Sequence, residues 1–129
     1  MTFFVDNCLP PQLVAALKAL DESVCHLKDV YPASVDDVDY IPEVAAKGWI
    51  IVTSDLAMRK RGSPQAAALK SAKAIAFFMP KGFASLPFWD QAWKLFKMWP
   101  TIRETAARAK PSDIYDVTVA GKVERKKIR

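Results

Sequence analysis

Acidic side chains follow two of the most apolar short stretches of the sequence. Asp6 comes directly after residues 2–5, and Asp55 comes two positions after residues 49–53. A third acidic group lies between these two positions in the chain and consists of Asp36, Asp37, Asp39 and Glu43. Carboxylates that crowd together repel one another, and hard cations such as Mg²⁺ and Mn²⁺, which take oxygen ligands, offset that repulsion. Acids brought together by the fold could therefore hold an ion that activates water and stabilises the leaving oxygen of a phosphodiester.

Basic residues lie close to these acids and at the end of the chain. Arg59, Lys60 and Arg61 follow Asp55 within six positions, where they could hold the phosphates of a substrate. The net charge is +5, and residues 121–129 contribute +4 of it with five basic residues and one acidic residue. Such a tail can attract nucleic acid or an acidic partner, although ordinary surface charge explains it equally well.

Each acid also has a structural alternative. Asp6 could cap the helix that follows it, and Asp55 could cap a turn over residues 56–60. One acid of the 36–39 segment could cap the next helix in the same way. Acids at the ends of both strands together with an acidic loop nevertheless favour a metal site over three independent caps.

The elements that must position these acids alternate along the chain. The apolar pattern predicts strands over residues 2–6, 24–27, 49–53 and 73–79, and helices over residues 11–20, 40–47, 64–72 and 87–109. Residues 28–38 are expected to form a polar loop, and residues 56–62 a basic turn. This order predicts an α/β fold with a central, mainly parallel sheet flanked by helices. Ligands bind such sheets at the carboxyl ends of the strands, where Asp6 and Asp55 would lie.

The last third of the chain predicts a long helix and a hairpin. Pro100 should kink or split the helix over residues 87–109. The aromatic residues of this helix are expected to pack mainly in the core rather than to form a stacking platform for nucleic acid, and an exposed patch that a partner covers stays open for some of them. They are Phe88, Trp89, Trp93, Phe96 and Trp99. Ala120-Gly121, between residues 114–119 and 122–127, predicts a C-terminal β-hairpin.

Length and composition limit the class of protein. A chain of 129 residues with 51% hydrophobic and 26% charged residues is typical of one globular domain, here residues 1–129 with a basic hairpin or tail from about 113 to 129. No apolar run approaches the roughly 18 residues of a membrane-spanning helix, and the N-terminus lacks the basic start of a signal peptide. Cys8, Cys25 and the single His26 indicate reduced thiols in a cytoplasmic protein rather than a disulfide framework or a zinc site.

Three segments resemble the PIN-like domains, and more narrowly the VapC-type toxins of bacterial toxin–antitoxin pairs. They are residues 3–9 (Phe-Phe-Val-Asp-Asn-Cys-Leu), residues 36–43 (Asp-Asp-Val-Asp-Tyr-Ile-Pro-Glu) and residues 48–59 (Gly-Trp-Ile-Ile-Val-Thr-Ser-Asp-Leu-Ala-Met-Arg). The resemblance continues through residues 88–108 and the hairpin at 114–125. It thus covers most of the chain, and the order and spacing of its short motifs carry it.

The resemblance implies an endoribonuclease that depends on Mg²⁺ or Mn²⁺. The implied catalytic acids and metal ligands are Asp6, Asp37 and Asp55, with Asp39 as a further ligand. Asp37 matches the family pattern best, Asp39 and Glu43 are its rivals, and Asp36 stays open as well. Asn7, Thr53 and Glu43 would support the site, and Arg59, Lys60 and Arg61 would bind RNA. The implied partners are an RNA substrate and a cognate antitoxin protein, and no membrane association is implied. Whether the chain forms a homodimer is left open. Many PIN domains carry a further acid after the fourth strand, where residues 77–82 have Lys81 and no acid.

Two other functions remain open. The missing acid and the basic tail suit a catalytically degenerate PIN-like module that binds RNA or protein. A receiver-type phosphoacceptor domain suits the length, the α/β order and Asp55. That class needs paired acids after the first strand, where this chain has Asp6-Asn7, and a lysine after a fifth parallel strand, which the hairpin is not expected to supply.

Overall fold

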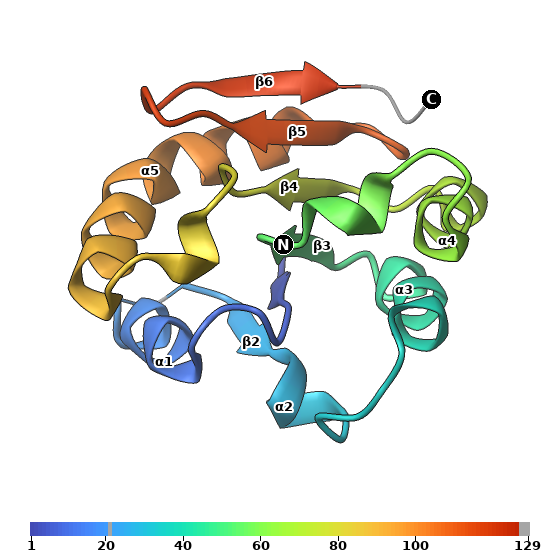
Figure 1. Cartoon of the computed structure of the whole chain (residues 1–129), viewed down its shortest axis with the longest axis horizontal. Helices are drawn as coiled ribbons and strands as arrows, with labels where there is room; N and C mark the ends of the chain where they lie inside the picture. The colour runs from blue at the N-terminus through green and yellow to red at the C-terminus, as the bar shows by residue number, and fades with distance from the viewer. Residues whose placement is uncertain (21, 127–129) are drawn as a thin grey trace.

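A six-stranded sheet lies between two layers of helices in the computed structural model, which describes residues 1–20 and 22–126 (Figure 1). The strand order is β2-β1-β3-β4-β5-β6. All neighbouring strands are parallel except β5 and β6, which form an antiparallel pair. The strands are β1 (Phe3–Val5), β2 (Val24–His26), β3 (Ile50–Thr53), β4 (Ala76–Phe78), β5 (Ile114–Val117) and β6 (Val123–Lys126). The predicted α/β fold with a mainly parallel sheet and a C-terminal hairpin is confirmed.

Helices cover both faces of this sheet. α1 and α5 lie on one face, and α3 and α4 lie on the other (Figure 1). The helices are α1 (Pro11–Ala19), α2 (Leu27–Val30), α3 (Asp37–Ala46), α4 (Pro64–Ala72) and α5 (Phe88–Arg108), with the short 3-10 helices η1 (Leu56–Arg59) and η2 (Phe83–Ser85). The chain thus alternates between strand and helix as the apolar pattern predicted.

Alternate residues of each strand build two separate cores. Phe3 and Val5 of β1 pack with α1 and α5, whereas Phe4 between them packs with α3. In β3, Val52 packs in the core on the side of α1 and α5, and Ile51 packs in the core on the side of α3. Because both faces are covered, the central strands β1 and β4 are apolar and buried at every position, which is typical of a parallel sheet. The carboxyl ends of β1, β3, β4 and β5 therefore meet at one edge.

Residues 27–30 form α2, where the last residue of a strand and the start of a loop at residue 28 were predicted. The imidazole Nδ1 of His26 accepts a hydrogen bond of 3.1 Å from the backbone N–H of Lys28, and the carboxylate of Asp29 accepts one of 2.9 Å from the N–H of His26. This capping box starts a helix too short to show apolar periodicity. The Nε2 of His26 donates to the carbonyl of Leu9 at 2.7 Å, so both ring nitrogens of this buried side chain have structural partners.

The prediction that Pro100 splits the last helix is wrong. α5 runs without interruption from residue 88 to residue 108. Pro100 is exposed, so water can reach the carbonyl that it leaves unpaired. Buried Leu95, Trp99 and Ile102 hold the helix against the sheet on both sides of the proline. Tertiary packing here outweighs the local cost of the proline.

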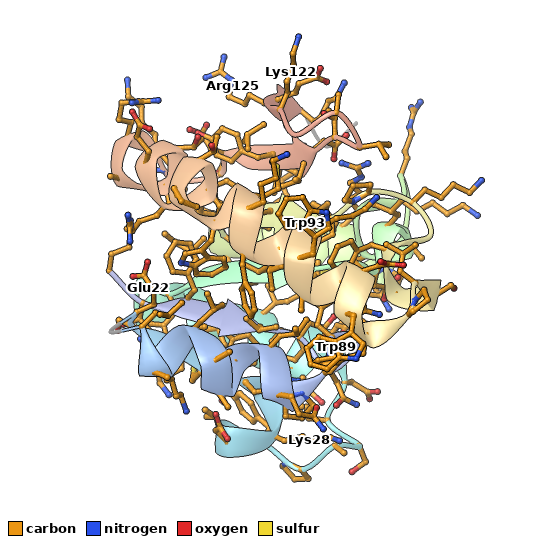
Figure 2. All side chains as sticks on the ribbon, turned by 90° about the vertical axis from the view of Figure 1, so that its left-hand side faces the viewer. Glu22, Lys28, Trp89, Trp93, Lys122 and Arg125 are labelled. Carbon is orange, nitrogen blue, oxygen red and sulfur yellow. The ribbon has the colours of Figure 1, made fainter. Side chains whose placement is uncertain are left out.

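The C-terminal hairpin supplies a fifth parallel strand, contrary to expectation. β5 pairs parallel with β4, and Tyr115 lies opposite Phe77. The last predicted residue of the hairpin, Lys127, lies outside the described residues, as do Ile128 and Arg129. Lys122, Arg125 and Lys126 of the predicted basic tail are exposed (Figure 2 labels the first two). Within residues 1–20 and 22–126, no helix has the length and apolarity needed to cross a membrane.

Candidate acidic active site

Asp6 is a buried carboxylate at the end of β1. Its side chain is only 5% exposed, and its Oδ2 accepts a hydrogen bond of 2.7 Å from the hydroxyl of Thr53. Its Oδ1 accepts a hydrogen bond from the backbone N–H of Asn7. The backbone N–H of Asp6 donates to the carbonyl of Val52 at 3.0 Å, which extends the β1–β3 pairing by one residue. The fold thus meets the cost of burying this carboxylate with donors from two segments.

Cys8 lies beside this carboxylate, although it was not among the predicted site residues. Its Sγ lies 3.6 Å from Oδ2 of Asp6 and 3.3 Å from the hydroxyl oxygen of Thr53. It also accepts a hydrogen bond of 3.2 Å from the backbone N–H of Ser54. Burial, and secondly the charge of Asp6, raise the pKa of the Cys8 thiol. Both cysteines are free, so the predicted reduced state agrees with the structure.

Asp55 combines a capping role with a place at the site. Its Oδ1 accepts a hydrogen bond of 3.1 Å from the backbone N–H of Ala57 and caps η1. Its own backbone N–H donates to the Thr53 hydroxyl at 3.0 Å, so this fully buried threonine joins Asp6 to the start of the Asp55 loop. Among the described residues, no hydrogen bond involves the Oδ2 of Asp55. One carboxylate oxygen therefore remains for a ligand.

Asp37 is electrically coupled to the other two acids. It is the first residue of α3 and is half-buried. Burial raises its pKa, and the negative charge of Asp6, followed more weakly by those of Asp55 and Asp36, raises it further. The fold therefore brings Asp37 near Asp6 and Asp55, although the three acids come from separate segments.

Two buried hydroxyl groups lie close to the site, that of Tyr40 beside Asp37 and that of Ser54 beside Cys8. Neither makes a hydrogen bond of good geometry within the described residues. Burial, and then the charges of Asp6 and Asp37, raise the pKa of Tyr40. An aromatic residue in an acidic segment indicates packing rather than a site, so nothing in the sequence pointed to this hydroxyl.

The remaining acids of the 36–43 segment lie outside this group. Asp36, Asp39 and Glu43 are all exposed. Glu43 accepts a hydrogen bond of 3.3 Å from the Tyr31 hydroxyl, and Asp36 makes no side-chain cap on α3. Of this segment, Asp37 is the residue most strongly coupled to Asp6. Asn7 is exposed beside Asp6 and contributes its backbone N–H rather than its side chain.

Arg59 is not a free phosphate ligand, because a neighbouring strand holds it. Its guanidinium forms an ion pair with Asp116 of β5 and lies 4.9 Å from the ring centre of Phe78. Its side chain is 25% exposed, and burial lowers the pKa of the guanidinium. Asp116 was not predicted near the site, because only the parallel pairing of β5 with β4 brings it opposite Phe78. Lys60 and Arg61 are exposed.

The chemistry of the three acids suits Mg²⁺ or Mn²⁺. Over the ranges that the structure describes, no three His, Cys, Asp or Glu side chains are already arranged around a metal position. The available donors are nevertheless carboxylate oxygens, which hard cations prefer. A cation would also remove the repulsion that raises the pKa of Asp37. The side chains of Asp6, Asp37 and Asp55 would have to close around such an ion.

Comparison with protein families matches residues 1–81 to the family described as PIN like domain. This range contains β1 to β4 and all three coupled acids. No curated protein and no solved structure matches the chain significantly.

Proposed function

The chain belongs to the PIN-like domain family, and on that premise we propose that it is a metal-dependent endoribonuclease. PIN-like domains are commonly nucleases. The observation that carries the proposal is the electrostatic coupling of Asp37 to Asp6 and Asp55 at the carboxyl edge of the sheet. Carboxylates at the edge where parallel sheets bind ligands support phosphodiester chemistry once the three side chains close around an ion.

Each acid would have a separate task. When bound, Mg²⁺ or Mn²⁺ would supply an activated water and neutralise the charge that develops on the phosphodiester. Asp6, Asp37 and Asp55 would hold the ion, with Asp39 as a further ligand if its exposed side chain turns inward. Thr53 would fix the orientation of the Asp6 carboxylate through its hydroxyl. Because burial and the charge of Asp6 raise the pKa of Asp37, metal binding at this residue should strengthen as the pH rises.

Positive charge near η1 would hold the RNA backbone. Lys60 and Arg61 are exposed and could contact phosphates directly. Arg59 would add positive charge from a fixed position, because Asp116 restrains its guanidinium.

We further propose that the protein acts in the cytoplasm as a VapC-type toxin with a cognate antitoxin; whether it also forms a homodimer is a separate question. Expression in a bacterial host should then arrest growth, and co-expression of a protein encoded by an adjacent gene should restore it. Growth arrest by wild type but not by the Asp6→Asn/Asp55→Asn variant would support this assignment. Undisturbed growth at high expression of folded wild-type protein would contradict it.

Metal binding and RNA cleavage test the enzymatic proposal directly. Calorimetric titration with Mn²⁺ should give saturable binding to wild type and none to folded Asp6→Asn/Asp55→Asn. Labelled single-stranded RNA should be cut with Mn²⁺, left intact with EDTA, and cut at least about 100-fold more slowly by either single variant, because each removes a charged ligand. Asp90→Asn, at an exposed acid of α5, is the matched control and should cut at the wild-type rate.

A catalytically degenerate PIN-like module is the second candidate. The absence of an acid directly after β4, where Pro80 and Lys81 lie instead, favours it. In that case wild type would bind RNA or a protein partner and would leave RNA intact with Mn²⁺. The Asp6→Asn/Asp55→Asn variant would behave as wild type does. A receiver-type function is not proposed, since Asp6 is followed by Asn7 rather than by a second acid, even though β5 supplies the fifth parallel strand.

A further inference from the structure

A cavity of about 480 Å³ opens between η2, α5 and the turn that joins β5 to β6. Its apolar wall includes Met79, Phe83 and Met98, and its rim carries Lys81, Lys94 and Lys97. No described residue that lines it is acidic. The volume falls within the range of small-ligand sites, and the lysines give it an excess of positive charge. The cavity therefore suits an anion that also has an apolar or aromatic part.

Trp93 supplies a flat aromatic surface at this cavity. Its side chain is 61% exposed, although the sequence predicted a core position, and Figure 2 shows it on the outer side of α5. The Nζ of Lys97 lies over one face of the Trp93 ring, 4.9 Å from the ring centre, so this aromatic surface carries a cation. Nucleobases stack on such rings, and lysines hold the phosphates attached to them.

Met79, which follows β4, lines the cavity, and the neighbouring strand β3 leads to the acidic site. The backbone N–H of Met79, which lines the cavity, donates to the carbonyl of Thr53 at 2.8 Å. The hydroxyl of the same Thr53 binds Asp6. A chain that crosses the carboxyl edge of the sheet at Asp6 can therefore continue toward the cavity.

From these relationships we infer that the cavity takes one nucleotide of single-stranded RNA, with its base against Trp93 and its phosphate against Lys94 and Lys97. This inference rests on the proposed function and adds a substrate subsite next to the carboxylates. An acidic peptide would satisfy the lysines as well. The position at the same edge of the sheet as the acids and the volume of about 480 Å³, which is suited to a single nucleotide, favour RNA.

The test measures binding without cleavage. A fluorescein-labelled ten-nucleotide single-stranded RNA is titrated by anisotropy in EDTA, with the Asp6→Asn/Asp55→Asn protein as the background. Trp93→Ala should weaken binding by roughly 5- to 100-fold, the range expected for loss of one stacked base. Lys94→Gln and Lys97→Gln should each reduce the slope of log affinity against log salt by about 0.7.

Two control variants match these changes. Trp89→Ala removes a tryptophan of α5 that is 80% exposed and does not line the cavity. Lys70→Gln removes an exposed lysine of α4, on the opposite face of the sheet. Both should bind RNA as the background protein does, and circular dichroism checks that every variant is folded.

The outcomes separate this inference from the proposed nuclease activity. RNA binding that is absent in EDTA, or unchanged by the Trp93 and lysine variants, would overturn the subsite even if wild type cuts RNA with Mn²⁺. Trp93-dependent binding without any cleavage by wild type would support the subsite and contradict the nuclease. A glutamate-rich peptide of equal charge that binds as tightly and with the same dependence on Trp93 would also overturn the inference.

Discussion

The hydroxyl of Thr53 donates a hydrogen bond of 2.7 Å to the carboxylate of Asp6, 47 positions away in the chain. Both side chains are buried, and they lie at the ends of the adjacent strands β3 and β1. The same hydroxyl accepts from the backbone N–H of Asp55. One threonine thus orients a buried acid and anchors the loop that carries a second acid.

Replacement of Thr53 tests this relationship. Thr53→Val keeps the shape of the side chain but leaves Asp6 and the Asp55 N–H each without one partner. We expect the free energy of unfolding, measured with urea at pH 7, to fall by about 1–3 kcal/mol. Thr53→Ser keeps the hydroxyl and should recover most of this loss. Equal stabilities of the valine variant and wild type would show that the hydrogen bond does not support the fold.

Replacement of Asp37 should stabilise the protein at neutral pH. The folded state raises the pKa of this group above its ordinary value of 3.8, so the folded protein binds the proton more tightly than the unfolded chain does. Stability contributed by this group therefore falls as the pH rises from 3.8 through the raised pKa. Asp37→Asn should unfold at a higher temperature than wild type at pH 7, and the difference should vanish toward pH 3.

Asp39→Asn is the control for that experiment. Asp39 lies in the same first turn of α3 but is exposed and is not among the charges that raise the pKa of Asp37. Its replacement should leave the stability equal or slightly lower, because a negative charge near a helix N-terminus is favourable. Equal stabilisation by both variants would mean that general charge reduction, rather than repulsion at the site, explains the effect.

The Arg59–Asp116 ion pair should contribute more than an exposed pair on α5. Its side chains are 25% and 22% exposed, whereas those of Arg108 and Glu104 are 70% and 73% exposed. A double-mutant cycle with Arg59→Met and Asp116→Asn should give a coupling energy of about 1 kcal/mol or more from urea unfolding. The corresponding cycle for Arg108 and Glu104 should give less than about 0.5 kcal/mol. The opposite ranking would contradict the role of Asp116 as the anchor of Arg59.

The reactivity of Cys8 should report the charge of Asp6. Burial and then the neighbouring carboxylate raise the pKa of the thiol, which leaves little reactive thiolate near pH 8. Iodoacetamide should therefore modify folded Cys8 more slowly than the unfolded chain, as mass spectrometry can follow. Asp6→Asn should speed the reaction of Cys8 but not that of Cys25, whose raised pKa follows from burial and Asp29. Equal acceleration at both cysteines would indicate general loosening of the fold.

The local pattern of the chain determined the elements and the two strongest acids. Apolar stretches ending in acids predicted β1 and β3 with Asp6 and Asp55, because buried parallel strands are apolar at every position and their ligands gather at one edge. The helix over residues 64–72 was predicted with its observed ends. The residues alone left Asp36, Asp37, Asp39 and Glu43 as equal candidates, since their order in the chain contains no information about which one faces the site. Only the family resemblance favoured Asp37.

Only the tertiary structure decided the contacts that cross between elements. The packing of α3 against the sheet couples Asp37 to Asp6, and the pairing of β5 with β4 brings Asp116 to Arg59. Local propensity predicted a break at Pro100 and buried positions for Trp89 and Trp93. Burial of Trp99 and Ile102 kept the helix whole, and the two tryptophans lie on its outer side, 80% and 61% exposed. Such outcomes depend on which face of an element meets its neighbours, and residues distant in the sequence set that choice.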